Sequence, residues 1–306
     1  MSILVVGSVA LDTVETPFGK VEDALGGSAI YFSTAASYFA PVRVVGVVGE
    51  DFGDDRLAFL KEKNVDLSGL VVKPGKTFRW GGKYGFDLNT RETLFTHLNV
   101  FEDFDPVIPE TFKDSQYVFL GNIAPELQLS VLQQISSPKL VALDTMNFWI
   151  EGSLPALKKT LKEIDVLIVN DAEARQLSQE PNLVKAARHI HELGPRVIII
   201  KKGEHGALLI SEGNYFWAPA YPLEFVYDPT GAGDTFAGGF LGYLAMTQDL
   251  SFENFKRAVV FGSTLASFCV EAFSLEKLKV LRESDIRQRF QEFWEMTNFD
   301  HVNSGF

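Results

Sequence analysis

The sequence predicts an α/β protein with a Rossmann-like, predominantly parallel sheet that carries helices on both faces. Short continuous runs of Val, Ile and Leu recur along the first two thirds of the chain, and segments with apolar residues at helical spacing lie between them. Strands that are apolar on both sides are typical of a parallel sheet whose two faces are both covered. A separate stretch alternates polar and aromatic residues instead, and it predicts a second, smaller β-sheet.

The elements of this fold can be placed along the chain from these patterns. The expected parallel strands are residues 3–7, 42–48, 117–120, 140–143, 166–169 and 197–200. Helices are expected at residues 30–39, 57–63, 127–135 and 183–193, where apolar residues recur at helical spacing. In the last third we expect a hairpin of residues 207–210 and 215–218, followed by long helices near 232–246, 252–272 and 284–296.

Two stretches depart from the alternation of strand and helix. Residues 13–25 look irregular and contain Pro17 and Gly19, whereas residues 77–101 contain two expected strands, 78–86 and 92–98. A small sheet that covers a ligand cleft is exposed to solvent on one face whenever the cleft is open. Alternating polar and aromatic residues are typical of such a sheet. We therefore predict a single domain over residues 1–306, with a small β-lid formed by about 13–25 and 77–101. The final residues, 299–306, are expected to be a loosely held tail.

The composition limits the partners of the protein. The 306 residues carry a net charge of −12, which repels nucleic acid and anionic membranes. No run of apolar residues is long enough to span a membrane, and no secretory signal is evident at the N-terminus. The single cysteine, Cys269, excludes an intrachain disulfide and suits a reducing compartment. These features predict a cytoplasmic protein with a small-molecule partner.

The most informative motif is a glycine-rich bend that follows a strand-like segment, 225–227, and precedes a long helix. We call residues 228–234 the anion turn; its sequence is Asp228-Pro229-Thr230-Gly231-Ala232-Gly233-Asp234. The glycines let the backbone turn tightly, so unpaired N–H groups gather at the start of the helix. Such a cluster of N–H groups is a ready site for a phosphate.

Asp234 lies in the first turn of that helix. Taken alone, it is explained equally well as an acidic residue favoured at a helix N-terminus. The complete string, however, resembles the C-terminal signature of the ribokinase-like (PfkB) carbohydrate kinase family. This resemblance implies that Asp234 deprotonates the acceptor hydroxyl, while the amides of Gly231, Ala232 and Gly233 hold the charge that develops during transfer. It also implies an ATP-dependent phosphotransferase with an alcohol acceptor.

The resemblance extends to the substrate motifs near the N-terminus. It implies that Asp12 binds substrate hydroxyls and that Gly26 and Gly27 form the paired-glycine turn that orients the substrate. The chain has Tyr31 where the family commonly has an asparagine that contacts the sugar. This departure puts simple pentose specificity in question, and Tyr31 either stacks on a flatter ligand or belongs to the core.

The nucleotide is expected at the loop that follows the strand 197–200. Residues 201–206 follow the strand 197–200 and resemble the nucleotide loop of the family, which implies nucleotide contacts for Lys201, Gly203 and Gly206. Thr230 of the anion turn joins them in this role. Asp144 and Asn147 follow the strand 140–143, at the sheet edge where ligands of open α/β sheets bind.

Two metal sites follow from the same resemblance. Asn170 and Glu173 have the spacing of a helix capping box, and in the family this pattern also holds Mg²⁺, largely through water, so both interpretations can apply together. In many relatives a monovalent cation lies beside the turn, coordinated partly by the residue that matches Asp228. The resemblance therefore leaves open an activation by K⁺.

The lid supplies the last candidates. Arg79 and Arg91 could neutralise phosphate or reach the substrate, although a charged residue on an exposed strand is usually just solvated. Trp80, Tyr84 and Phe86 alternate with other residues, so one lid face could cover a ligand or the lid of a second copy. A homodimer through the lid is thus an expectation.

The predicted function is ATP-dependent phosphorylation of a hydroxyl group on a small sugar-like substrate. The alternative within the same fold is a nucleoside kinase, which the aromatic lid and Tyr31 favour. A non-catalytic protein that binds a metabolite is a further alternative, but it would be expected to lack Asp234 or the glycines. The resemblance implies ATP as phosphoryl donor and Mg²⁺ as cofactor.

Overall fold

The computed structural model describes residues 1–298 of the chain. Within these residues, one sheet of nine strands has the order β13-β12-β11-β10-β9-β8-β1-β4-β5. Its strands are β1 (Ile3–Val6), β4 (Val42–Gly49), β5 (Val65–Lys73), β8 (Tyr117–Leu120), β9 (Leu140–Asp144), β10 (Val166–Asn170), β11 (Val197–Lys201), β12 (Ala207–Ser211) and β13 (Asn214–Ala218). All neighbours are parallel except the pairs that include β12. The predicted, mainly parallel sheet is confirmed.

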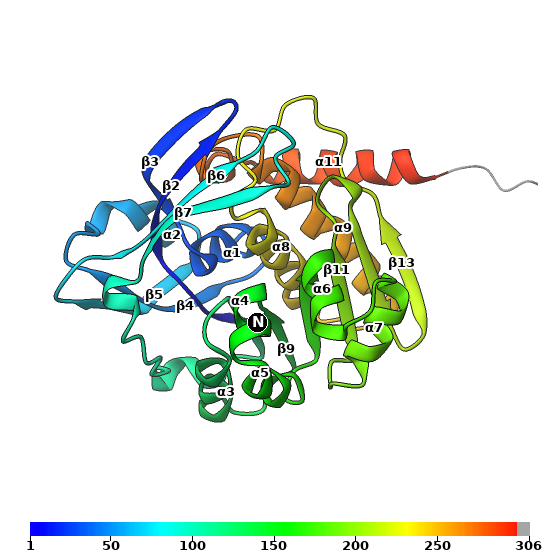
Figure 1. Cartoon of the computed structure of the whole chain (residues 1–306), viewed down its shortest axis with the longest axis horizontal. Coiled ribbons are helices and arrows are strands. Elements are labelled where there is room, and N and C mark those ends of the chain that lie inside the picture. The colour runs from blue at the N-terminus through cyan, green and yellow to red at the C-terminus, as the bar shows by residue number, and fades with distance from the viewer. Residues whose placement is uncertain (299–306) are drawn as a thin grey trace, which may run out of the picture.

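Helices cover both faces of this sheet (Figure 1). They are α1 (Ser28–Ala36), α2 (Ala58–Lys61), α3 (Pro125–Gln134), α4 (Asn147–Gly152), α5 (Leu154–Leu161), α6 (Asp171–Ser178), α7 (Leu183–His191), α8 (Ala232–Thr247), α9 (Phe252–Cys269), α10 (Glu276–Lys279) and α11 (Glu283–Thr297). Side chains alternate across a strand, so Ile3 and Val5 of β1 pack with α1, α8 and α9, whereas Leu4 and Val6 join the core under α3, α5, α6 and α7. This double burial explains the continuous apolar runs.

A second sheet, the lid, has the order β3-β2-β6-β7 (Figure 1). Its strands are β2 (Ala10–Thr16), β3 (Gly19–Gly26), β6 (Phe78–Tyr84) and β7 (Arg91–His97). The expectation that residues 13–25 are irregular was wrong, because they belong to the β2–β3 hairpin. Charged residues alternate along β3 and are exposed, and the turn contains Pro17 and Gly19, so the pattern resembled a loop.

Other differences from the predicted elements lie outside the lid. The segment 225–227 forms no strand, although the Tyr227 N–H donates to the Val270 carbonyl at 2.8 Å. Strand β5 and helices α4, α5 and α6 were not predicted. β5 lies at the edge of the sheet and alternates buried with exposed residues, so it lacks the continuous apolar run of the inner strands. The tail predicted at 299–306 lies outside the described residues.

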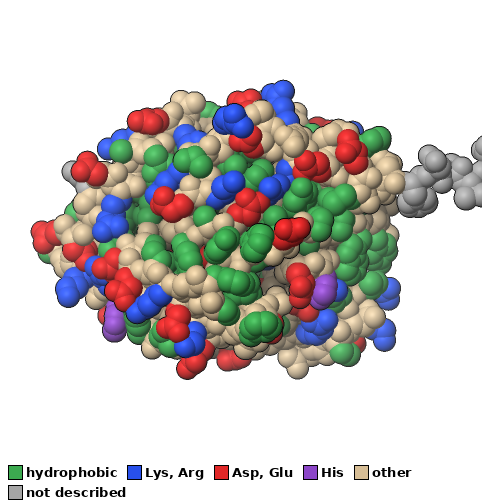
Figure 2. All heavy atoms as spheres, turned by 90° about the horizontal axis from the view of Figure 1, so that it is seen from above, with side chains coloured by type: hydrophobic (Ala, Val, Ile, Leu, Met, Phe, Trp, Pro, Cys, Tyr) green, Lys and Arg blue, Asp and Glu red, His purple; other side chains and the backbone are tan. Residues whose placement is uncertain are grey.

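The apolar helices are all too short or too polar to cross a bilayer. Over residues 1–298, no helix combines the length and hydropathy that a membrane span requires. Figure 2 shows Lys and Arg side chains intermixed with Asp and Glu on the face seen from above, so this face has no continuous basic band.

Candidate active site

Three neighbouring strands end in polar side chains at the same edge of the sheet. Asp144 ends β9, Asn170 ends β10 and Lys201 ends β11. The register pairs Asn170 with Lys201, and Ile168 of the same strand with Asp144. Ligands of open parallel sheets bind outside the carboxyl ends of the strands, so this edge is where a site is expected.

The anion turn leads into α8 with its amides exposed. Gly231 is the N-cap and has φ 74°, a left-handed conformation that favours glycine. Within residues 1–298, the N–H groups of Gly231 and Gly233 donate to no backbone or side-chain acceptor. The Asp234 N–H is directed at its own carboxylate. The turn thus presents free donors at the positive end of a long helix, as expected of an anion site.

Tyr31 fills the space directly behind this turn. A Cβ on Gly231 would lie 2.4 Å from three atoms of the Tyr31 ring, so the ring is packed against the glycine backbone. Only 2% of Tyr31 is exposed. Of the two interpretations left open by the sequence, the geometry therefore favours the core residue over a residue that stacks on a ligand.

Asp228 fixes the turn to the chain segment after α9. Its Oδ1 accepts the Thr230 N–H at 2.9 Å and its Oδ2 accepts the Ser274 N–H at 3.0 Å. Asp228 is fully buried, and burial raises the pKa of its carboxyl although these hydrogen bonds oppose the shift. Ser274, with φ 55°, in turn donates its hydroxyl to the Leu25 carbonyl at 2.5 Å. A series of hydrogen bonds therefore connects the anion turn to Leu25, the residue before the paired glycines.

Asp234 lies among the charges of Asp144 and Lys201 at two strand ends and of Glu173 in α6. Burial, together with the charge of Asp144, raises the pKa of Asp234 to about 7, although Lys201 opposes the shift. The side chain is partly exposed rather than enclosed. A carboxylate that is ionised near neutral pH and still basic matches the requirement for a general base.

Asn170 and Glu173 form the capping box of α6. The Glu173 N–H donates to Asn170 Oδ1, and the Asn170 N–H donates to Glu173 Oε2, both at 2.8 Å. Burial and the nearby Asp144 raise the pKa of Glu173 to about 7. The capping prediction is confirmed, and the carboxylate and amide oxygens are also the kind of ligand that Mg²⁺ prefers.

The substrate motif is tightly built around Asp12. Asp12 is 5% exposed, and its pKa is raised to about 8 by burial and by the charges of Asp228 and Asp234. A Cβ on Gly26 would lie 1.9 Å from Asp12 Oδ2, and Gly27 has φ 94° with the Ser8 carbonyl 2.4 Å from its Cβ position. Neither glycine position has room for a side chain, so the paired glycines are required by this packing.

The predicted nucleotide loop bends sharply after β11. Gly203 has φ 54° and Gly206 has φ 84°, and a Cβ on Gly206 would lie 2.0 Å from the Ala218 carbonyl oxygen. The Lys202 N–H donates to the Gly206 carbonyl at 2.7 Å and closes the loop. Lys201, at the start of the loop, points toward the anion turn, because a Cβ on Gly233 would lie 2.7 Å from its Nζ.

Residues of the lid also lie close to the site at the sheet edge. Asp12 of β2 is paired in register with Trp80 of β6, so the two side chains share one face of the lid sheet, and the Trp80 ring extends over Gly82, two residues further along β6. The Arg91 guanidinium lies 5.2 Å from the Trp80 ring centre, and its charge lowers the pKa of Glu173 against burial. Thr230 donates its hydroxyl to the Tyr84 hydroxyl at 3.2 Å. The structure thus brings Arg91, Trp80 and Tyr84 to the site.

Arg79, by contrast, is held at the base of the lid. It forms ion pairs with Asp23 of β3 and, at 3.2 Å, with Asp51, which follows β4. Asp51 also accepts the Thr77 N–H at 2.7 Å. These contacts support a role for Arg79 in holding the lid to the main sheet. This cluster could not be predicted from the sequence, because Asp23, Asp51 and Arg79 lie far apart along the chain.

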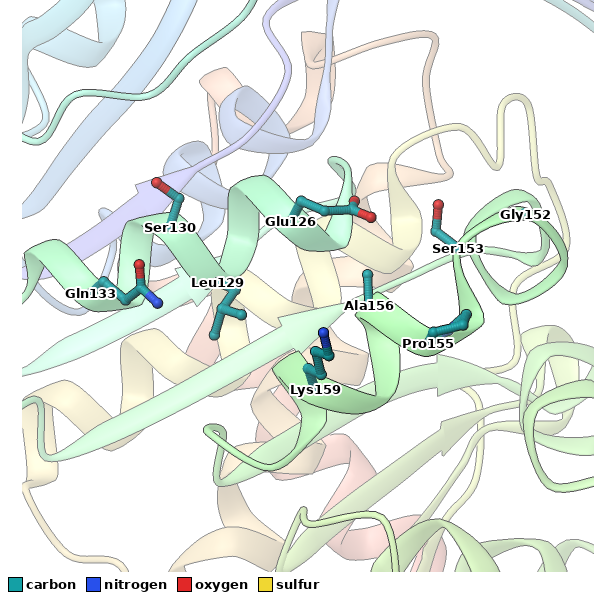
Figure 3. Close-up of a pocket in the computed structure, with 9 residues that line it drawn as sticks. All are labelled: Glu126, Leu129, Ser130, Gln133, Gly152, Ser153, Pro155, Ala156 and Lys159. Carbon is teal, nitrogen blue, oxygen red and sulfur yellow. The ribbon is translucent and has the colours of Figure 1, made fainter.

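A shallow groove of about 490 Å³ lies elsewhere on the molecule (Figure 3). Glu126, Leu129, Ser130 and Gln133 line it from α3, and the other side is formed by the residues from Gly152 to Lys159 at the start of α5. It contains none of the residues that converge at the sheet edge. We assign it no role.

Comparison with known proteins agrees with the class that the fold and site define. A family model described as pfkB family carbohydrate kinase matches residues 2–278. The cytidine kinase of Thermococcus kodakarensis is 31% identical over 251 residues, which is 79% of this chain and 88% of that protein. The ribokinase of Lactococcus lactis is 28% identical over 284 residues, covering 86% and 90%.

A solved structure shares the fold. The putative ribokinase II from E. coli, in complex with ATP and Mg²⁺, has a TM-score of 0.77 and 20% identity, covering 95% of this chain and 99% of that one. The chain belongs to the pfkB family of carbohydrate kinases. It is an ATP-dependent kinase that phosphorylates a hydroxyl group of a sugar or nucleoside. The predicted family, fold and enzyme class are confirmed.

Proposed function

We propose that this kinase phosphorylates a nucleoside, using ATP as donor. The observation that carries the proposal is the position of Trp80 next to Asp12 in the register of β2 and β6. A substrate whose hydroxyl is bound by Asp12 lies on the same face of the lid sheet as this indole, and a flat base can stack on an aromatic ring. The identity of 31% with a cytidine kinase over most of both chains supports the same choice.

The chemistry follows from the residues around the anion turn. Asp12 and the turn at Gly26 and Gly27 orient the acceptor, and Asp234 accepts the proton of its hydroxyl. The free N–H groups of Gly231 and Gly233 stabilise the charge that develops on the transferring group, and the Ala232 N–H, which donates to the Pro229 carbonyl at 3.3 Å, is proposed to join them. Phosphoryl transfer has a loose transition state, so positioning and electrostatic stabilisation matter more than a strong base. A base with a pKa near 7 is sufficient.

The donor is proposed to bind across the nucleotide loop. Lys201, Gly203, Gly206 and Thr230 are the proposed nucleotide contacts, since the two glycines let the loop turn tightly at the sheet edge and Lys201 reaches the anion turn. Asn170 and Glu173 are proposed to hold Mg²⁺, mostly through water, because their oxygens stand at the same sheet edge. When bound, Mg²⁺ supplies charge neutralisation on phosphate oxygens.

A monovalent cation at Asp228 is a separate part of the proposal. The Asp228 carboxylate is buried, no Lys or Arg within residues 1–298 forms an ion pair with it, and each of its oxygens accepts one backbone N–H. A buried carboxylate in this state is stabilised by a nearby cation. Activity should therefore rise when K⁺ replaces a large organic cation at constant ionic strength, and no change would remove K⁺ from the proposal.

A sugar acceptor is the second candidate. It is supported by the identity of 28% with a ribokinase over 86% of this chain. The two candidates are separated by measuring ADP release and phosphorylated product with cytidine, uridine, adenosine, inosine and ribose under identical conditions. Higher kcat/KM for a nucleoside than for ribose supports the proposal, and the reverse order would overturn it.

The role of Asp234 is tested in the same assay. Asp234→Asn should lower kcat by about 10²–10⁴-fold, because a general base contributes about that much. The variant should keep its fold, since replacing a carboxyl whose pKa is raised by burial removes a desolvation cost. The exposed Asp103→Asn is a control for the loss of one surface charge. Near-full activity of Asp234→Asn would exclude Asp234 as the base.

A homodimer through the lid is proposed on the basis of its exposed apolar residues. Phe86 lies two residues beyond the end of β6 and is 96% exposed. Leu94 lies on the edge strand β7 and is 46% exposed. Large apolar side chains in exposed positions favour association. Light scattering after gel filtration should give twice the chain mass, and Leu94→Lys should reduce it to the monomer. A monomeric wild type would end this part of the proposal.

A further inference from the structure

Lys201 ends β11 with its ammonium group inside the site. Only 17% of the side chain is exposed, although the charged head of a lysine is normally kept in water. Its Nζ lies 3.7 Å from Asp144 Oδ2, across the end of β10, which separates β9 from β11. Asp144 is itself 8% exposed, and its Oδ1 accepts the Thr145 N–H at 2.8 Å. The carboxylate therefore has one oxygen fixed by the backbone and presents the other to the lysine.

The same ammonium lies against the anion turn. A Cβ on Gly233 would be 2.7 Å from Nζ, so the lysine occupies the space that any larger residue at 233 would take. Glu173 and Asp234 also face this charge. Burial opposes protonation of Lys201, but Asp144, Glu173 and Asp234 outweigh it and raise the pKa of the lysine. A positive charge is therefore fixed among three carboxylates, next to the free N–H groups of Gly231 and Gly233.

We propose that the Lys201 ammonium contacts the phosphoryl group during transfer and that Asp144 is the positioning residue that holds it at Gly233. This inference rests on the proposed function of the anion turn. It assigns Lys201 a contact with the transferring phosphoryl group, which is more specific than nucleotide binding in general. During transfer, the bond from the acceptor oxygen to the γ-phosphorus forms, the bond to the bridging oxygen of ADP breaks, and the hydroxyl proton goes to Asp234. Lys201 exchanges no proton and contributes only charge.

Physical arguments favour this role over a purely structural ion pair. The charge of the transferring group is spread over its oxygens, and a cation that is already in place stabilises it without reorganisation. Protein kinases hold their phosphate-binding lysine with a glutamate on an unrelated fold, and the active state needs that pair. An ion pair that served only the stability of the fold would not require the ammonium to lie beside Gly233 of the anion turn.

The first test does not depend on the acceptor. Wild-type protein is melted with Mg²⁺ and ADP, and again with aluminium fluoride added, which mimics the transferring group. We expect aluminium fluoride to raise the Tm beyond the shift caused by ADP. Lys201→Met should keep the shift caused by ADP and lose the additional one. If Lys201→Met retains the additional shift, or loses the ADP shift as well, the proposal is wrong.

The second test is kinetic and uses whichever nucleoside or sugar the wild type phosphorylates. Lys201→Met should lower kcat by about 10²–10³-fold, as removal of one transition-state donor does, with little change in the KM of the acceptor. Asp144→Asn should lower kcat less, and Lys201→Arg should restore part of the loss. The double variant Asp144→Asn/Lys201→Met should be no slower than Lys201→Met alone, because Asp144 acts through the lysine. Additive losses would show that Asp144 acts independently.

A matched control lies at the opposite end of the same strands. Arg196 and Asp165 precede β11 and β10 and form an ion pair at 3.1 Å, remote from the carboxyl ends. Arg196→Met removes this more exposed ion pair, which lies away from the site, and should leave kcat unchanged. A wild type that phosphorylates no nucleoside or sugar would contradict the proposed function, whereas a wild type that does so while Lys201→Met keeps its kcat contradicts only this inference.

Discussion

The hydroxyl groups of Tyr84 and Thr230 lie 3.2 Å apart, which joins the lid to the anion turn. Tyr84 is 8% exposed, so this contact is shielded from water. At the lid tip, Asn89 Nδ2 donates to Glu204 Oε1 at 3.2 Å, and a Cβ on Gly203 would lie 3.1 Å from Asn89 Oδ1. The lid is therefore in contact with the turn and with the nucleotide loop at the same time.

Tyr84→Phe should weaken this connection while keeping the aromatic ring. A buried hydrogen bond contributes about 1 kcal/mol, which corresponds to a change of about fivefold in the population of the closed lid. We expect the KM of the acceptor to rise by about that factor, with a smaller change in kcat, in steady-state assays. The exposed Tyr215→Phe on β13 serves as a control. An unchanged KM would mean that the contact does not hold the lid.

Gly231→Ala tests the packing of the anion turn on Tyr31. The new Cβ would lie 2.4 Å from the ring at a residue with φ 74°. Gly213 has φ 81° with nothing within 4 Å of its Cβ position, so Gly213→Ala measures the conformational cost alone. That cost is about 1 kcal/mol. Denaturant unfolding should show a clearly larger loss for Gly231→Ala, together with reduced kcat, and equal losses would contradict the packing argument.

Much of the fold could be predicted because burial on both faces leaves a strong pattern. The inner strands β1 and β8 and the first four residues of β11 are fully buried, and their continuous apolar runs identify them. Strands with one open face were less visible, since β3 carries mainly exposed charged residues and β5 alternates. The β2–β3 hairpin was missed for this reason.

The candidate site was predictable where one continuous motif carries it, as in the anion turn. Contacts between motifs were not predictable, because residues from distant parts of the chain meet only after folding. Lys201 and Asp144 were both noted as strand-end residues, but their pairing depends on the strand order β9-β10-β11. The same holds for Tyr84 with Thr230, and Tyr31 could not be assigned to the core before the position of Gly231 was known.

The buried Asp12 should make the stability of the ligand-free protein depend on pH. Its pKa rises from 3.8 to about 8 on folding, chiefly through burial. The folded state therefore binds more protons than the unfolded state across this range, and the contribution of Asp12 to stability is lost as the pH rises toward about 8. The stability of Asp12→Asn, which cannot ionise, should gain on that of the wild type as the pH rises from 3.8 to about 8. Melting curves at several pH values measure this difference, and a gap that stays constant with pH would contradict it.

Glu173→Gln separates the two roles of the capping box. Gln can still accept the Asn170 N–H through its side-chain oxygen, so α6 should keep its cap and the Tm should not fall. The variant lacks the carboxylate charge, and an amide oxygen binds Mg²⁺ more weakly than a carboxylate does. We therefore expect half-maximal activity to need a higher Mg²⁺ concentration, with kcat largely recovered at saturation. Glu173→Ala provides the comparison, because it removes both the charge and the reciprocal hydrogen bond from the Asn170 N–H, while the Asn170 side chain still caps the helix; it should lower the Tm by an amount that corresponds to about 1 kcal/mol. If Glu173→Gln needs no more Mg²⁺ than the wild type, Glu173 acts only as a helix cap and the metal must be held by other groups at the sheet edge.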